Sequence, residues 1–317
     1  MRLIDKLPMV HPPEDRYTLI PASKGFKPFL LGGRTKQVFP FAVDNLFYRG
    51  IAFNKKYKPI VKPFEKVYPE ETSIDVVLED LKEEIENIKE SLEIPLNKFK
   101  FGTYIPTRYG FLKIYSLAKN VSKAELIRTI ELYIEEDINE NFPGKEVVYA
   151  YDFLKTEKDE PYRVLITIVE SEIIQKLETW AENIGIRLDI ISYEPICLIN
   201  LGLLKGLPIP FTILYTDVNK ILVLAYQKDR ILYEEFSYVF SPDKMAEDVL
   251  NLIIWDIRNY IVLNDLSNIY LAGVVTEYEH LMEYFLEKLP IFGIVSIDVF
   301  PERYSLLYTL GERLLNV

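Results

Sequence analysis

The stretch YTDVNKILVLAY, from Tyr215 to Tyr226, combines a strand, a tight turn and a second strand, with Asp217 where the chain turns. In many nucleotide-binding folds a hairpin of this kind holds a phosphate. Backbone N–H groups approach phosphate oxygens closely where glycine leaves out the Cβ atom. This hairpin contains no glycine. The sequence therefore raises the question of what the hairpin holds.

The chain after residue 210 predicts an antiparallel meander followed by alternating helices and strands. Residues 210–240 predict three successive strands. Ser241 and Pro242 predict the start of a helix that runs to about Ile261. We expect its buried face to contain Met245, Val249, Leu252, Ile253, Ile257 and Ile261. A strand at 268–273, a helix at about 275–289, the segment 293–300 and a last helix at about 304–315 complete this part.

The first two thirds of the chain repeat that plan around an additional unit. Residues 17–44 predict two or three strands, and Thr72 or Ser73 predicts the start of a helix. One apolar stripe follows it, formed by Ile74, Val77, Leu78, Leu81, Ile85, Ile88 and Leu92. Residues 99–118 predict strands again. From Ser122, which forms a capping box with Glu125, the order is helix, strand, strand, helix, strand.

This order predicts a two-lobed α/β protein, in which a meander and its helices occur twice with a small α+β insertion between them. We expect lobe I at residues 1–210, with the insertion at about 122–193. Lobe II then covers residues 211–317, and its C-terminal helix packs back on lobe I. The two halves differ too much for sequence similarity alone to establish a repeat.

Composition narrows the classes of function. The net charge of −11 disfavours nucleic acid as a partner, because its phosphate backbone is also negative. No apolar run reaches the roughly 18 residues of a membrane helix, and the N-terminus lacks a signal-peptide pattern. A single cysteine and two histidines exclude an internal disulfide and disfavour a metal centre or a Ser-His-Asp triad. We expect a cytoplasmic protein, and its many Glu, Lys and Ile residues are typical of a thermophile.

Taken in order, these segments resemble the PilM family of type IV pilus assembly proteins, which has the actin/Hsp70 fold of ribonuclease H-like repeats. The resemblance is best from Ser122 to the end. It rests on SKAELIRTIELYIEEDI, VVYAYDFL, SEIIQKLETWAENIGIRLDIISYEP, ILYTDVNKILVLAYQKDRILYEEF, NIYLAG and SLLYTLGERL. The order and spacing of these segments carry it, since no single motif is highly specific.

Nucleotide-binding members of the superfamily that this chain resembles hold ATP with Mg²⁺, but each nucleotide element is altered here. We therefore expect no cofactor, and ATP with Mg²⁺ is the alternative. Aligned on Lys27, the first hairpin has Ile20 in place of the family's Asp. The second keeps Asp217 but has Val218 and Asn219 where Gly and small hydroxyl residues are expected. The adenosine strand has Gly273 followed by Val274 in place of a second glycine. If a nucleotide binds, we expect Lys27, Asp217 and Gly273 to contact it. The altered motifs indicate that the second hairpin binds nucleotide poorly or not at all.

The resemblance implies a scaffold without catalytic residues, peripheral to the inner membrane, in type IV pilus or type II secretion-like assembly. Its partner would be the cytoplasmic tail of a PilN-like membrane protein, and homo-oligomer formation stays open. Tyr149, Tyr151 and Phe153 alternate along one strand and are the candidates for tail binding; alternatively they face the insertion's own core. We expect Glu194 and Pro195 to shape the crossing between the lobes.

Two enzymatic alternatives remain open from the sequence. The first is an ATP-binding actin-like ATPase with an unusual nucleotide site. The second is a sugar or acetate kinase of the same superfamily, for which the sequence shows no identifiable catalytic acid.

Overall fold

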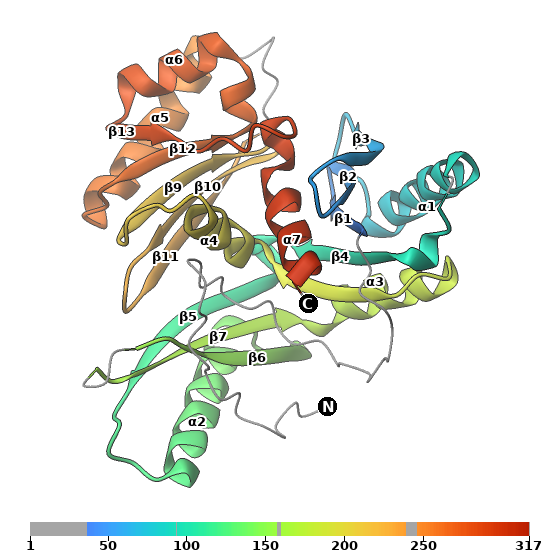
Figure 1. Ribbon diagram of the computed structural model, residues 1–317. Coiled ribbons are helices and arrows are strands. Elements are labelled where there is room, and N and C mark those ends of the chain that lie inside the picture. Colours follow the sequence, from blue (N-terminus) through green and yellow to red (C-terminus); the bar gives the residue numbers. More distant parts are fainter. Residues whose placement is uncertain (1–36, 93, 157–159, 239–245, 317) are drawn as a thin grey trace.

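The computed structural model describes residues 37–92, 94–156, 160–238 and 246–316, which form two lobes and an inserted subdomain (Figure 1). The lobe I sheet has the order β3-β2-β1-β4-β8 and the lobe II sheet the order β11-β10-β9-β12-β13. In lobe I, β1 pairs antiparallel with β2 and parallel with β4. In lobe II, β9 likewise pairs antiparallel with β10 and parallel with β12. The expected two-lobed α/β fold is therefore confirmed. The lobe I strands are β1 Gln37–Asp44, β2 Phe47–Asn54, β3 Pro59–Val67, β4 Phe99–Ile105 and β8 Leu188–Tyr193; those of lobe II are β9 Phe211–Thr216, β10 Lys220–Tyr226, β11 Ile231–Ser237, β12 Ile269–Gly273 and β13 Ile291–Ile294.

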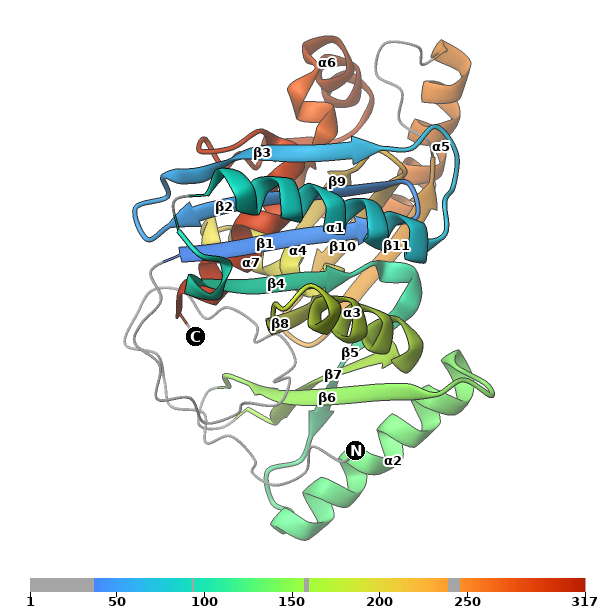
Figure 2. The same cartoon turned by 90° about the vertical axis from the view of Figure 1, so that its right-hand side faces the viewer.

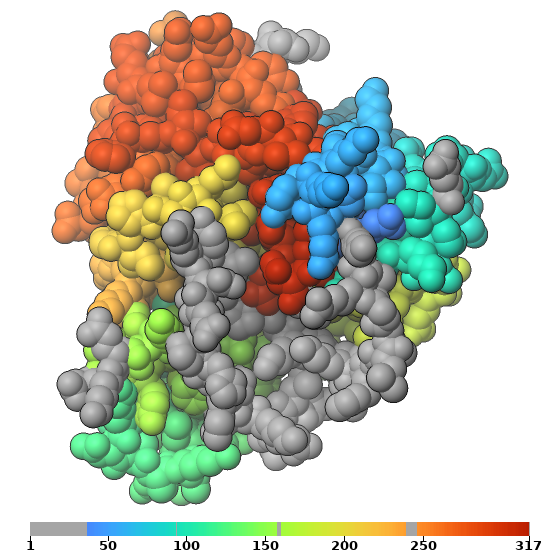
Figure 3. Space-filling model, viewed as in Figure 1, coloured from blue at the N-terminus to red at the C-terminus, as the bar shows by residue number. Residues whose placement is uncertain are grey.

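Helices cover the outer faces of both sheets and fill the space between the lobes. Helices α1 (Ile74–Ser91) and α3 (Ser171–Asn183) lie on lobe I, whereas α5 (Glu247–Leu263) and α6 (Glu279–Lys288) lie on lobe II (Figures 1 and 2). Helix α4 (Glu194–Leu204) connects the lobes. The C-terminal helix α7 (Ser305–Asn316) packs on β1, β4 and α4, as expected of a helix that returns to lobe I. In the space-filling view, red atoms of the C-terminal part separate the two lobes (Figure 3).

The insertion is a three-stranded sheet with one helix, and its boundaries differ from the expected 122–193. Its strands have the order β5-β7-β6, and the capping box of Ser122 and Glu125 at the start of α2 is confirmed. The sheet includes β5, which precedes Ser122, whereas β8 pairs in parallel with β4 in lobe I. Sequence order placed β8 with the insertion, but its pairing partner decides where it belongs. The elements are β5 Gly110–Leu117, α2 Lys123–Asn141, β6 Val147–Leu154 and β7 Tyr162–Glu170.

Three expectations about helices need correction. Ser73 is the N-cap residue of α1, but its side chain makes no capping hydrogen bond. Helix α5 starts at Glu247, and Val249 and Leu252 are exposed. Its buried face is instead Leu250, Ile253, Ile254, Ile257 and Ile261. Helix α4 was not expected, because its residues are apolar on every side and show no helical period. Residues Ser241 to Met245 lie outside the described part of the chain.

Candidate functional site

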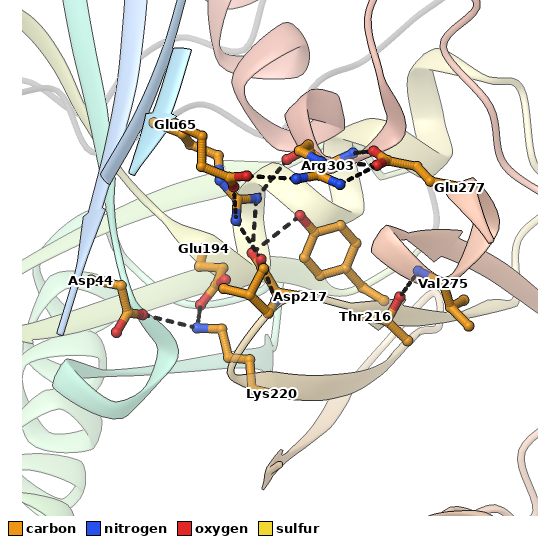
Figure 4. A network of polar contacts seen from close by, with 12 residues as sticks. Asp44, Glu65, Glu194, Thr216, Asp217, Lys220, Val275, Glu277 and Arg303 are labelled. Atoms are coloured by element: carbon orange, nitrogen blue, oxygen red, sulfur yellow. Dashed lines mark hydrogen bonds and ion pairs between the residues drawn. The ribbon is translucent and has the colours of Figure 1, made fainter. Parts of the chain in front are cut away.

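The two strand hairpins at the centres of the lobes face each other across the interlobe boundary (Figure 4). Each is closed by a two-residue turn without glycine, Asn45–Leu46 in lobe I and Val218–Asn219 in lobe II. Asp44 ends β1 and Asp217 follows β9, and both are buried. The acids occupy equivalent places in the two lobes because β1 and β9 have the same position in their sheets.

This arrangement corrects the expected first hairpin. The lobe I counterpart of the Asp217 hairpin is β1–β2, and it retains an acid, Asp44, rather than the Ile20 that the alignment on Lys27 suggested. Lys27 itself lies outside the described residues. Asp217 is confirmed in the hairpin turn.

A buried arginine from lobe I neutralises Asp217. Arg49 lies on β2, and its guanidinium donates to both carboxylate oxygens of Asp217, with N–O distances of 2.6 and 3.2 Å. It also forms an ion pair of 2.9 Å with Glu65 and donates to the carbonyl oxygen of Arg303 at 2.7 Å. A bidentate arginine–carboxylate pair is geometrically specific. The two lobes are therefore joined at the place where the acid of lobe II would otherwise be free to bind a cation.

A buried lysine from lobe II makes the reciprocal connection to lobe I. Lys220 is the first residue of β10, and its Nζ lies 2.6 Å from Glu194 Oε2 and 3.6 Å from Asp44 Oδ2. Glu235 of β11 is a third carboxylate, at 3.5 Å. Glu194 also accepts hydrogen bonds from the backbone N–H and hydroxyl of Thr107. The acid of each hairpin is thus paired with a cation from the other lobe's hairpin, and Glu194 contacts Thr107 of lobe I and Lys220 of lobe II.

An outer layer of charged side chains surrounds this network. Arg303 pairs with Glu277 and Glu65, and Arg108 pairs with Asp44 at 2.8 Å. Together these contacts form the interlobe ion network, which contains more carboxylates than cations: Asp44, Glu65, Glu194, Asp217, Glu235 and Glu277 against Arg49, Arg108, Lys220 and Arg303.

Burial and pairing shift the pKa values of the network in different directions. Burial alone would raise the pKa of Asp44, but the charges of Lys220 and Arg108 outweigh burial and hold that pKa below its ordinary value. Burial raises the pKa of Glu194 despite the nearby Lys220, and Glu235 adds to the rise. Burial opposes the charge of Lys220, yet its carboxylate neighbours raise its pKa above the ordinary value. Lys220 therefore stays charged and is shared by several acids.

The backbone around Gly273 explains why this position is a glycine. Its φ is +87°, and a Cβ atom there would lie 2.1 Å from the carbonyl oxygen of Thr216 at the end of β9. The following turn is tied to the same strand, because the Val275 N–H donates to the Thr216 hydroxyl at 2.8 Å. The side chain of Val274 is buried beside it. The close approach at this glycine is to the protein's own backbone.

The residues present do not fit a magnesium–nucleotide complex. The hairpin turns lack the glycines that let backbone N–H groups reach phosphate oxygens. Both acids that could hold a hydrated magnesium ion already bind Arg49 or Lys220. The excess of carboxylates would repel a triphosphate. Within the described ranges, no group of three or more His, Cys, Asp or Glu is placed to hold a metal ion.

The aromatic residues suggested for partner binding lie on β6, which pairs with β7 at one edge of the inserted sheet. Tyr149, Tyr151 and Phe153 are half-buried and pack against the insertion's core, which includes Ile130 and Ile134 of α2. Part of each ring is therefore buried within the insertion, which agrees with the alternative that these residues face the insertion's own core.

The sequence reasoning missed Asp44, Arg49 and Lys220, which the structure brings together. Arg49 lies inside β2 and Lys220 begins β10, and each is the single cation of a largely apolar strand. Such a cation needs a buried acid nearby, and that requirement was the available signal.

Comparison with known proteins identifies the fold. No protein-family model and no curated protein matches the chain. A chain of a "PilM-PilN type IV pilus biogenesis complex" is 11% identical, with a TM-score of 0.68 over 89% of this chain and 99% of that one. A Bacteroides thetaiotaomicron protein of unknown function with an actin-like ATPase fold is 13% identical, with a TM-score of 0.53 over 87% and 96%. The ethanolamine utilization protein EutJ from Carboxydothermus hydrogenoformans is 10% identical, with a TM-score of 0.50 over 92% of both chains.

The sheet topology and these likenesses define an α/β protein with the actin-like ATPase fold. More particularly, its fold is PilM-like, as the sequence resemblance implied. None of the helices in the described part of the chain is both long and apolar enough to cross a membrane.

Proposed function

We propose that this protein is a PilM-like scaffold that binds the cytoplasmic tail of a PilN-like inner-membrane protein in type IV pilus or type II secretion-like assembly, without hydrolysing ATP. The PilM-like fold supports the assembly role. In this proposal the protein is cytoplasmic and reaches the membrane through its partner.

The interlobe ion network carries the non-hydrolysing part of the proposal. In an actin-like ATPase, a nucleotide with its magnesium ion lies between the lobes. Here Arg49 crosses to Asp217 and Lys220 crosses to Asp44, so cations of the protein itself occupy the acids of both hairpins. Breaking these buried pairs to admit a nucleotide would leave uncompensated charges, at a cost of about 3–5 kcal/mol each.

The inserted subdomain is the proposed tail-binding region. Strand β6 lies at the edge of its sheet, so an extended peptide could add main-chain hydrogen bonds there. Tyr149, Tyr151 and Phe153 would contact alternate side chains of the peptide with the parts of their rings that the insertion's core leaves exposed.

The test is a titration of the full-length protein with a synthetic peptide of a PilN-like cytoplasmic tail, with and without Mg²⁺ and ATP. The proposal predicts saturable binding with the same affinity in both conditions. Tyr151→Ser should weaken binding, whereas Leu132→Ser, at an exposed position on α2, should leave it unchanged. An affinity that depends on Mg²⁺ and ATP would instead favour a nucleotide-regulated protein, and absence of binding would refute the partner assignment.

A further inference from the structure

Helix α5 is apolar on the side that faces away from its sheet as well as on the side that packs against it. Leu250, Ile253, Ile254, Ile257 and Ile261 form its buried face. The opposite side carries four large apolar residues with high exposed fractions, which we call the outer face of α5: Leu252 (52%), Trp255 (62%), Val262 (72%) and Leu263 (84%). Figure 2 shows α5 and α6 together on the outside of lobe II.

The outer face has the spacing of a surface that packs against another helix. Leu252, Trp255 and Val262 are three and seven residues apart, which places them in one stripe along the helix, with the polar Asn259 between Trp255 and Val262. Exposed apolar residues that gather in one stripe, rather than lie singly on the surface, are typical of an interaction site. An exposed tryptophan within an apolar stripe is typical of an interface anchor, because it offers a large contact area at small entropic cost.

Acidic side chains border this stripe. Glu247 and Asp248 lie in the first turn of α5. Helix α6 lies alongside, since the Tyr284 hydroxyl donates to Asn251 at 2.6 Å and Arg258 donates to the carbonyl oxygen of Lys288. Helix α6 carries three exposed acids of its own, Glu279, Glu283 and Glu287, of which Glu287 pairs with Lys288. Arg258 and Lys288 are the cations beside them, so the border is predominantly negative.

The negative charge beside the outer face of α5 discriminates between three binding partners: a second copy of this chain, an anionic lipid surface and a basic helix. A second copy of this chain would bring the same acidic border against itself, and like charges in an interface are unfavourable. An anionic lipid surface would be repelled for the same reason, since lipid-binding helices carry Lys and Arg beside their apolar face. A helix with an apolar stripe flanked by Lys and Arg is complementary in both shape and charge.

We propose that the outer face of α5 docks a basic amphipathic helix of a partner protein, with Trp255 as the central anchor and the acids of α5 and α6 pairing with its Lys and Arg residues. The outer face of α5 belongs to lobe II and is separate from the inserted subdomain. It would therefore give the protein a second, separate partner site that does not depend on the proposed tail binding.

The two tryptophans provide the readout. Trp255 is exposed, whereas Trp180 is buried and donates to the carbonyl oxygen of Leu78. The full-length protein is titrated with a synthetic amphipathic helix of leucine and lysine about 14 residues long, which makes about four turns. We expect a saturable blue shift of the fluorescence and protection from acrylamide. A peptide with glutamate in place of lysine should produce neither, and higher salt should weaken the effect. The shift should disappear in Trp255→Phe.

Variants on the surface of the folded protein separate a specific site from general attraction to an acidic protein. Replacing both Leu252 and Val262 by serine keeps Trp255 as the reporter and is expected to weaken binding at least about tenfold, or about 1.4 kcal/mol. Leu132→Ser on α2, whose side chain is 49% exposed, is the matched control and should bind normally.

Three results would overturn the proposal. The first is equal affinity of the double variant and the wild type for the lysine peptide. The second is a blue shift that grows with protein concentration alone and accompanies a dimer in sedimentation, which would assign the face to a second copy. The third is an equal shift with phosphatidylserine vesicles, which would assign it to a membrane surface.

Discussion

Replacing Arg49 by methionine tests the interlobe ion network, because it removes the cation and keeps much of the side-chain volume. Arg49 is fully buried and is held by Asp217 at 2.6 and 3.2 Å, by Glu65 at 2.9 Å and by the carbonyl oxygen of Arg303 at 2.7 Å. The variant leaves Asp217 buried, and among the described residues the Val218 N–H and the Tyr215 hydroxyl remain as its hydrogen-bond donors.

The expected loss of stability is about 3–5 kcal/mol, because removing one partner leaves an uncompensated buried charge. For a chain of this size, that corresponds to a fall in melting temperature of roughly 5–8 °C. The double variant Arg49→Met with Asp217→Asn removes both charges, so it should lose less than the sum of the two single variants.

Thermal unfolding followed by circular dichroism measures these effects. Lys82→Met is the matched control, since it breaks an exposed pair with Glu79 and should leave the melting temperature unchanged. A melting temperature of Arg49→Met equal to that of the control, or simple additivity of Arg49→Met and Asp217→Asn, would show that Arg49 does not stabilise the buried Asp217.

Three further predictions follow from single residues. Gly273→Ala should lower stability by several kcal/mol because its Cβ would meet backbone at 2.1 Å, whereas Gly144→Ala, with φ +76° and open space, should lose only about 1–2 kcal/mol in the same melting assay. The lowered pKa of Asp44 means that its stabilising effect is present above its unfolded pKa of about 3.9 and is lost as pH falls through its folded pKa. The stability gap between wild type and Asp44→Asn should therefore narrow as pH falls below about 4 in acid-unfolding curves, and a gap that stays constant there would contradict this assignment. Lys220→Met should cost about 3–5 kcal/mol because several carboxylates share that cation. Glu194→Gln should cost less than about 1.5 kcal/mol because it keeps a hydrogen-bond acceptor and removes a carboxylate whose pKa burial raises; urea unfolding of the two variants in parallel would reveal an inverted order.

The order of secondary structure was accessible from local sequence signals. The order of helix, strand, strand, helix and strand that was expected from Ser122 onward is the order of α2, β6, β7, α3 and β8. The capping box of Ser122 and Glu125 is likewise a local pattern that the structure reproduces. Such features depend on residues a few positions apart, so a single sequence is sufficient to find them.

The sequence did not show which side of α5 is buried. Because this helix is apolar on both sides, Val249 and Leu252 fit a buried stripe as well as Leu250 and Ile254 do. Hydrophobic periodicity identifies a buried face only when the other face is polar. The exposed apolar residues of α5 therefore explain both the wrong prediction of its buried face and the proposed docking surface.

The site depended on contacts between distant parts of the chain. The alignment placed the first hairpin around Lys27, whereas the parallel pairing of β1 with β4 identifies β1–β2 as the lobe I counterpart of β9–β10. The partners Arg49 and Asp217 are 168 residues apart, and neither local pattern nor spacing connects them. Only the closed arrangement of the two lobes shows that each hairpin acid is paired across the boundary.

The most direct test of the central claim is calorimetric titration of the full-length protein with ATP, with and without Mg²⁺, at concentrations that would detect a millimolar site. If the protein's own cations hold Asp44 and Asp217, the titration shows no Mg²⁺-dependent heat of binding. Saturable Mg²⁺-dependent binding of ATP would contradict the account, because it would show that a nucleotide can displace Arg49 and Lys220 from the two acids.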